Sequence, residues 1–347
     1  MSAQIRVWRP LERPELGMAN SVSDVICRQE WLKVDLLTSV RRGPTLFLAS
    51  DYGGAHKGAH FETFSFLLID LQYLWLWEEL RTKLRKHTLL QRRRMAFKSL
   101  NDVTRWQAVV PFLRYANTLP GLLATFALDR GAMDIVSESP PESEDSVIGV
   151  LNDWKLSPFR KLSCVAQLGA TLVAGMSAPG QNVIWISDDD DIAPNREKLF
   201  EATRVIGQYM SVILPHDMGH LRFGTAGTVD PGDLQAEDLL ALADLASGTV
   251  SEMLTLCWRK VGTGGSKILL PGSRFLTNKA KLIANWLSES DHPLRKLIIL
   301  VEGTGRNYKT KSVNILSEDS GRCQSSFDWR REVNEHLKGR IVAWERT

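Results

Sequence analysis

The chain has 347 residues, of which 44% are hydrophobic and 24% are charged. That hydrophobic share supports a substantial core and excludes a globally disordered chain, and the length predicts about two domains or one enlarged domain. With 43 basic and 40 acidic side chains the net charge is +3, so the overall charge indicates no particular partner.

The four cysteines, Cys27, Cys164, Cys257 and Cys323, are widely spaced and contain no Cys-x-x-Cys pair. This spacing favours neither a zinc site nor a disulfide framework and is typical of a reducing compartment. Residues 1–6 lack the apolar core of a signal peptide. No apolar run reaches the roughly 18 residues of a membrane span. We therefore expect a cytoplasmic protein without a membrane segment.

The first 43 residues are mixed in character. Pro10, Pro14 and Gly17 break the early part, and residues 23–40 have room for a short helix. We interpret residues 1–43 as an N-terminal extension.

Two strands are predicted next. Residues 45–50 form a short apolar run bounded by glycine and proline. Residues 61–70 form the second strand, in which Phe64, Phe66 and Leu68 would share one face. The glycine-rich link between them is typical of a hairpin connection.

Helices and strands alternate beyond residue 70. Leucine and tryptophan at helical spacing predict a long helix over 72–100, which continues after a break over 106–116. An acidic segment with two prolines, 137–145, predicts a mobile loop. Further strands are predicted over 122–128, 183–186 and 221–223, and further helices over 157–175, 195–210 and 237–258. This series predicts an α/β fold with a mixed sheet flanked by helices.

A glycine-rich hinge is predicted at 262–266, so that residues 44–260 form the main domain. Residues 267–347 would be a C-terminal α/β tail, a region that could dock a protein partner. Within this tail we expect a helix over 278–288, a strand over 296–301 and a final helix over 329–337.

Three aspartate positions carry the functional prediction. Asp51 ends one apolar strand, the run Asp188–Asp191 follows another, and Asp244 lies in an apolar helix. An ionised carboxylate inside an apolar element costs several kcal/mol unless it is paired or bound to a metal. Carboxylate oxygens are the ligands that Mg²⁺ prefers. The ordinary role of a single strand-end aspartate is to cap a helix or close a turn.

A dense basic run lies in the predicted long helix. It predicts a positive face that neutralises nucleic-acid phosphates, with Lys86, Arg92, Arg93, Arg94 and Lys98 as binding residues. The alternatives are a solvated helix face or a surface docked on an acidic partner. The run consists of Arg81, Lys83, Arg85, Lys86, His87, Arg92, Arg93, Arg94 and Lys98.

The histidines give weaker signals. His56 and His60 lie near Asp51 in a glycine-rich loop, where either could act as an acid or base, although a loop histidine without such a role is the more common case. His216 and His220 are four residues apart, but Pro215 and Gly219 argue against a helix that presents both to zinc.

The segment Leu240–Gly248, with the sequence LALADLASG, resembles the Leu-Gln-x-Ala-Asp-Leu-x-x-Gly signature of a group of uncharacterised bacterial RNase H-like proteins. Those proteins open with a strand ending in Asp-Glu-Ser-Gly, which Asp51–Gly54 resembles, and they carry an acidic residue after a later strand, as Asp188 or Asp189 does here. The resemblance covers about residues 45–255.

This resemblance implies an RNase H-like fold and a nuclease that cleaves DNA or RNA with two Mg²⁺ or Mn²⁺ ions. Asp51, Asp188 and Asp244 would be the metal ligands, and Asp189 would join them as a catalytic residue. It further implies a place in bacterial phage defence or in a mobile element.

The chain departs from the resembled pattern at several positions. Tyr52 replaces the glutamate of the first motif, Ala241 replaces the glutamine of the last, and Ala96-Phe97-Lys98 keeps only the lysine of a Glu-x-Lys motif. In the simplest RNase H layout, Asp129 would take the place of Asp188. A second hypothesis is therefore a catalytically silent RNase H-like module that binds nucleic acid or a protein partner.

Overall fold

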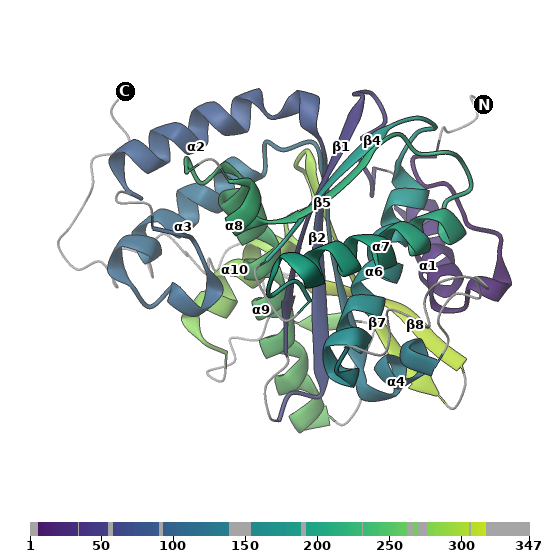
Figure 1. Ribbon diagram of the computed structural model, residues 1–347. Helices are drawn as coiled ribbons and strands as arrows, with labels where there is room; N and C mark the ends of the chain where they lie inside the picture. The colour runs from purple at the N-terminus through teal and green to yellow at the C-terminus, as the bar shows by residue number, and fades with distance from the viewer. Residues whose placement is uncertain are drawn as a thin grey trace, which may run out of the picture.

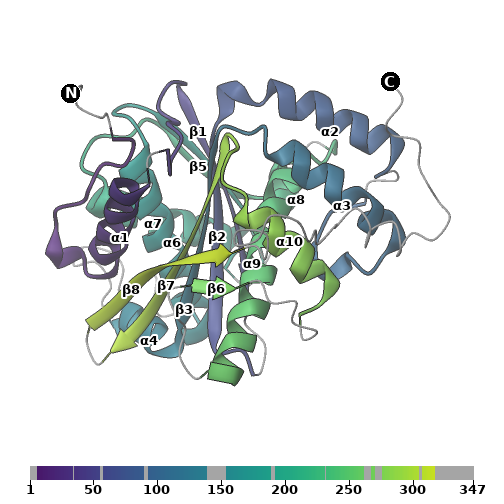
Figure 2. The ribbon, with the colours of Figure 1, turned by 180° about the vertical axis from the view of Figure 1, so that it is seen from behind.

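The computed structural model describes residues 6–33, 35–54, 58–89, 93–138, 154–188, 192–230, 232–261, 267–269, 276–304 and 307–316. Within these residues eight strands form one sheet in the order β5-β4-β1-β2-β3-β7-β8-β6. Helices cover both faces of the sheet (Figures 1 and 2). The predicted α/β fold, a mixed sheet flanked by helices, is confirmed. The strands are β1 (Thr45–Gly53), β2 (Phe61–Asp70), β3 (Gly121–Asp129), β4 (Asn182–Ser187), β5 (Leu221–Thr225), β6 (Lys267–Leu269), β7 (Leu294–Thr304) and β8 (Asn307–Leu316).

The helices form two layers, one on each face of the sheet (Figures 1 and 2). The first layer holds α1 (Met18–Leu32), α4 (Arg130–Glu138), α6 (Leu156–Met176) and α7 (Arg196–Ile213). The second holds α2 (Trp75–His87), α3 (Val103–Ala116), α8 (Ala226–Val229), α9 (Gln235–Val261) and α10 (Asn278–Ser288).

The centre of the sheet combines a hairpin with a parallel pair. β1 runs antiparallel to β2, and β2 runs antiparallel to β3. On its other side β1 pairs in parallel with β4, and β4 pairs in parallel with β5. β1, β4 and β5 therefore end at the same edge of the sheet. Because β2 is antiparallel to both β1 and β3, β3 runs in the direction of β1 and also ends at that edge.

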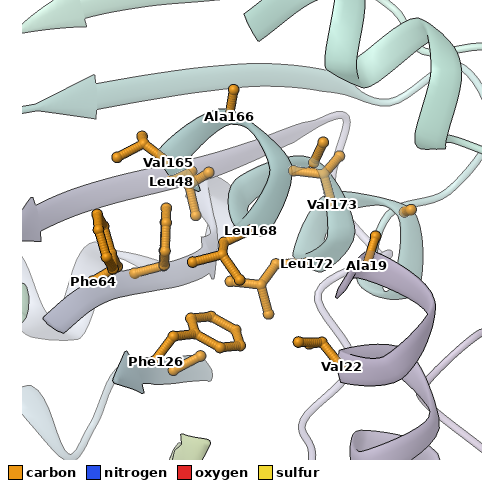
Figure 3. Packing of buried hydrophobic residues seen from close by; sticks show 14 of the residues in the cluster. Ala19, Val22, Leu48, Phe64, Phe126, Val165, Ala166, Leu168, Leu172 and Val173 are labelled. Carbon is orange, nitrogen blue, oxygen red and sulfur yellow. The ribbon is translucent and has the colours of Figure 1, made fainter. Parts of the chain in front are cut away.

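Alternation along β1 separates two hydrophobic cores. Leu46 and Leu48 belong to the core under α1, α4, α6 and α7. Phe47 and Ala49 belong to the core under α2, α3, α9 and α10. Figure 3 shows the first core, where Leu168 and Leu172 of α6 lie between the sheet residue Phe126 and the side chains of α1.

The N-terminal segment is part of the first core. Met18, Ala19 and Val22 of α1 are fully buried in it, and α1 packs on α6 and β8. Trp8 is 2% exposed, and its indole Nε1 donates to Ser23 Oγ at 3.0 Å. A Cβ at Gly175 of α6 would lie 2.3 Å from the Trp8 ring, so glycine is required there.

The region after 267 also joins the sheet, because β7 pairs in parallel with β3 and β8 pairs with β7. The division at 1–43, 44–260 and 267–347 remains a prediction about domains. In this structure the described parts of all three segments share their cores with the central sheet.

Most predicted elements are found close to their expected positions. The strand over 61–70 and the helix over 278–288 have the predicted bounds. The single helix predicted over 72–100 is wrong, since α2 ends at His87 and a 3-10 turn occupies Phe97–Ser99. The chain leaves the helix to bury Leu89 and Met95, which are 1% and 3% exposed.

Four helices and strands were not predicted: α4, which overlaps the start of the expected loop at 137–145, the short helix α8, and the strands β6 and β8. The rest of that loop, the hinge at 262–266 and the helix expected over 329–337 lie outside the described residues.

One helix among the described residues, Gln235–Arg259 within α9, is long and apolar enough by composition to cross a membrane. Of its most apolar window, 72% is buried inside the fold. A core helix that is apolar on nearly all sides meets the same criterion.

A buried ion-pair network fastens α2 to the start of α9. The Asp238 carboxylate, 1% exposed, accepts from Nε and Nη2 of Arg85 and, at 3.1 Å, from Nη1 of Arg81. Arg81 is itself 3% exposed, and it also pairs with Glu78 at 2.5 Å and donates to the Asp233 carbonyl at 2.9 Å. Arg81 and Arg85, two members of the predicted basic run, are thus neutralised inside the protein.

We predict that Asp238→Asn lowers the free energy of unfolding by about 3–5 kcal/mol, because Arg85 would lose its paired carboxylate and the buried Arg81 would keep Glu78 and Asp233 but lose its buried acidic partner. Urea denaturation measures the effect. The matched control is Lys83→Ala, which removes an ion pair between two half-exposed side chains, Lys83 and Glu79, and should leave stability unchanged. Equal stabilities for Asp238→Asn and the parent would contradict the role of the network.

Candidate functional site

Strand register brings the first two predicted aspartates together. Ser50 of β1 pairs with Ser187 of β4 in the parallel ladder, so Asp51 and Asp188 are the next neighbours along it. The Asp188 backbone N–H donates to the Ser50 carbonyl at 3.2 Å. Adjacent strands are about 4.8 Å apart. Asp51 follows Phe47 and Ala49 in alternation, and Asp188 follows Ile184 and Ile186, so both side chains point to the face covered by α9.

Helix α9 lies unusually close to the end of β1. A Cβ at Gly53 would be 3.0 Å from Ser247 Oγ, and a Cβ at Gly54 would be 3.0 Å from Ser251 Oγ. Gly54 also has a φ of +82°, which favours glycine. Thr63 Oγ1 of β2 donates to the Ser247 carbonyl at 3.1 Å. This close contact places Asp244, one turn before Ser247, over the ends of β1 and β4.

Asp244 is held by the backbone of the 3-10 turn. Its Oδ2 accepts from the Phe97 N–H at 2.5 Å. The Phe97 carbonyl in turn accepts from Lys279 Nζ of α10 at 3.0 Å. Burial raises the pKa of Asp244 to about 6. The Phe97 hydrogen bond and the charges of Lys98 and Lys279 oppose that rise, while the nearby charge of Asp188 adds to it.

These groups line one cavity of about 810 Å³. Its walls include the end of β1, the segment 94–98 and one stripe of α9. Five predicted site residues take part: Asp51, Asp188, Asp244, Arg94 and Lys98. The remaining lining residues are Tyr52, Gly53, Gly54, Met95, Ala96, Phe97, Glu237, Leu240, Ala241, Ser247, Gly248, Ser251, Glu252, Thr255, Leu256, Arg259 and Lys279.

Other predicted binding residues do not reach this cavity. Lys86 is exposed on α2 and does not line it. Arg93 pairs with Asp102 at 2.8 Å, beside the start of α3. Arg94 lines the cavity and pairs with the buried Glu237 at 2.7 Å. Arg92 and Asp189 lie outside the described residues.

Asp129, the alternative to Asp188, has a local structural role. Its Oδ1 accepts from the Ala132 N–H at 2.7 Å and from the Gly303 N–H at 2.9 Å. It thereby caps the start of α4 and ties it to β7. Asp129 does not belong to the described lining of the cavity, whereas Asp188 does.

Tyr52, at the position of the glutamate in the motif that this segment resembles, extends towards the other side of the sheet. Its hydroxyl hydrogen-bonds Ser50 Oγ at 2.8 Å and Ser187 Oγ at 3.0 Å, linking β1 to β4. The ring also lies under Lys161 Nζ, 4.8 Å from its centroid. This side chain therefore joins two strands behind the aspartates.

Three of the four histidines singled out from the sequence are described. His60 stacks on Trp258 with ring centroids 3.5 Å apart, and His56 lies outside the described residues. His216 and His220 lie in the loop between α7 and β5, where His216 Nε2 is 3.2 Å from Ser177 Oγ. No helix presents these two side chains together.

Carboxylate oxygens have the chemistry that Mg²⁺ and Mn²⁺ require. Asp244, raised in pKa by burial and by Asp188, is a group whose ionised form a cation would stabilise. However, no three His, Cys, Asp or Glu side chains of the described residues are grouped closely enough to hold a metal ion. Asp51, Asp188 and Asp244, the expected metal ligands, therefore line one cavity without forming such a group, and the metal centre remains a prediction.

Sequence reasoning missed the small polar residues that continue the cavity along α9. Ser247, Gly248, Ser251 and Thr255 follow Asp244 at intervals of three, four, seven and eleven residues, which places them on the same helix face. This spacing, which places polar residues along one face of a helix, can be recognised from the sequence alone. Lys279 carried no such signal, because only the packing of α10 on α9 brings it to the cavity.

No protein-family model matches the chain, and no curated protein matches it in sequence. Among solved structures, the ribonuclease H2 from Pyrococcus horikoshii OT3 is similar over 70% of this chain and 85% of its own, with 11% identity and a TM-score of 0.34. A likeness at that level supports no conclusion about the function of this chain.

The raised pKa of Asp244 predicts a pH-dependent cost in stability. Above pH 6 the Asp244 carboxylate is ionised in both states, but it is buried in the folded protein and fully hydrated in the unfolded chain. Its ionisation therefore lowers the free energy of unfolding. As the pH falls through about 6 the folded state takes up a proton, and the cost disappears near pH 4. Asp244→Asn should therefore raise the free energy of unfolding at pH 8 by about 1–3 kcal/mol and have little effect near pH 4.

Urea unfolding at the two pH values measures this difference. Asp102→Asn is a control of opposite sign, since the Arg105 N–H and Arg93 lower the pKa of Asp102 and its ionised form stabilises the fold at pH 8. A decrease in the free energy of unfolding for Asp244→Asn at pH 8 would show that ionised Asp244 does not destabilise the folded protein.

Proposed function

We propose that this protein is a divalent-metal-dependent nuclease of the RNase H-like type, which hydrolyses phosphodiester bonds of DNA or RNA. The observation that supports it best is the meeting of Asp51, Asp188 and Asp244, from two adjacent parallel strands and the helix above them, at one cavity. Gathering three acidic side chains from separate elements around one cavity brings like charges together, and a bound divalent cation would offset that repulsion.

In this proposal the three aspartates would hold Mg²⁺ or Mn²⁺. Bound divalent ions supply a deprotonated water and stabilise the leaving oxygen of a phosphodiester. The Phe97 N–H fixes the orientation of Asp244. Lys98 and Arg94, both exposed at the rim, would hold phosphate charge next to the carboxylates. Arg94 would exchange or share its ion pair with Glu237 when it holds phosphate.

A second candidate is a catalytically silent module of the same type that binds nucleic acid or a protein partner. The lack of a three-ligand group among the described residues favours it, as does Tyr52 in place of an acidic residue. Such a module would bind nucleic acid through the cavity rim without binding a metal. A role in phage defence or in a mobile element rests on the motif resemblance alone.

We predict that the parent binds Mn²⁺ by calorimetry and that Asp51→Asn and Asp244→Asn abolish this binding. Cleavage of single- and double-stranded DNA and RNA in Mg²⁺ should fall by roughly 10²–10³-fold in each variant, because a lost ligand removes several kcal/mol of transition-state stabilisation.

The matched control is Asp129→Asn, which changes an aspartate at the same edge of the sheet but outside the cavity and should keep metal binding and cleavage. Unchanged cleavage in Asp51→Asn and Asp244→Asn would end the nuclease proposal. A parent that binds nucleic acid but neither binds Mn²⁺ nor cleaves would identify the silent module.

A further inference from the structure

The cavity is long because it follows one stripe of α9. Its lining residues from this helix run from Glu237 to Arg259 and recur every three or four positions. At 1.5 Å per residue, the 22 steps between these two residues span about 33 Å. Asp244 lies about 10 Å from the Glu237 end, so about two-thirds of the cavity extends beyond the carboxylates.

The cavity is also narrow. Its volume of about 810 Å³ spread over about 33 Å gives a mean cross-section of roughly 25 Å². One side is the β1–β2 hairpin, where a Cβ at Gly58 would lie 3.6 Å from Arg259 Nη2. A double helix is far wider, since its major groove alone measures about 12 Å. A single extended chain fits such a groove.

The part beyond the carboxylates carries hydrogen-bonding groups that the fold leaves unused. Ser247 and Ser251 are 1% and 4% exposed, and their hydroxyl oxygens have no hydrogen-bond partner within the described residues. The same holds for the buried hydroxyl oxygen of Thr255. Buried polar atoms normally find partners. Three that line one groove indicate a polar ligand.

Charge along the groove indicates the kind of ligand. Lys98, Arg94 and Lys279 line it near the aspartates, and Arg259 lies exposed at the far end. Glu252 also lines this stretch, but its carboxylate accepts from the Thr277 N–H at 2.7 Å and from Thr277 Oγ1 at 3.0 Å. Cations at both ends and hydroxyls between them suit a chain that carries an anion at every repeat.

We propose that this groove, which we call the α9 groove (lining residues Glu237 to Arg259 of α9), binds an extended single strand of DNA or RNA. The backbone of the strand passes from the aspartates along Ser251 and Thr255 to Arg259. This inference rests on the proposed nuclease function and specifies its substrate as single-stranded.

Fluorescence anisotropy tests it with 20-nucleotide single-stranded DNA, single-stranded RNA and the matching duplexes, in EDTA to prevent cleavage. Single strands should bind at least about ten-fold more tightly than duplexes. Arg259→Ala should weaken single-strand binding by about ten-fold and reduce the slope of log K against log salt by about 0.7, the value of one phosphate contact.

Three further variants separate binding from folding. Arg259→Lys keeps the charge and should restore the salt slope. Ser251→Ala removes a hydroxyl without adding volume, and Thr255→Leu narrows the α9 groove; each should weaken single strands several-fold. Arg204→Ala, exposed on α7 on the opposite face of the sheet, is the unaffected control.

Tight duplex binding with a salt slope that Arg259→Ala leaves unchanged would overturn the single-strand assignment while the nuclease proposal stands. A parent that neither binds nor cleaves any of the four nucleic acids would overturn the proposed function as well. Preference between the DNA and RNA strands then identifies the sugar that the α9 groove accepts.

Discussion

The parallel pairing of β1 with β4 is the constraint on which the rest of the site depends. It makes Asp51 and Asp188 neighbours in one ladder and, through strand alternation, turns both to the same face. A register shift of one residue would send one of them to the opposite core. The apolar residues that precede them, Phe47, Ala49 and Ile186, hold that register because their face is buried.

Much of the fold follows from patterns in the sequence. The strand over 61–70 and the helix over 278–288 were predictable with their bounds because apolar periodicity and turn residues agree there. The helix predicted through residue 100 failed because its leucine spacing continues past His87, where tertiary packing of Leu89 and Met95 overrides it. β8 was missed since its first half, with two lysines, a threonine and a serine in succession, carries little apolar signal.

The candidate site was predictable in its acidic members and less so in its basic ones. Asp51, Asp188 and Asp244 stand out in the sequence because each is a polar residue at the end or in the middle of an apolar element, and all three line one cavity. The density of basic residues in the sequence could not show that Arg81 and Arg85 form ion pairs with Asp238 inside the fold. Only spatial packing distinguishes a cation that holds helices together from one that faces a cavity.

The peptide group of Phe97 links an acid to a base. Its N–H holds Asp244 and its carbonyl holds Lys279, while its ring lies so close to α9 that a Cβ at Gly248 would be 2.5 Å away. The 3-10 turn that carries Lys98 is therefore tied at three points to the two helices that carry Asp244 and Lys279. A substitution that displaced this turn would remove a hydrogen bond from the acid and another from the base at the same time.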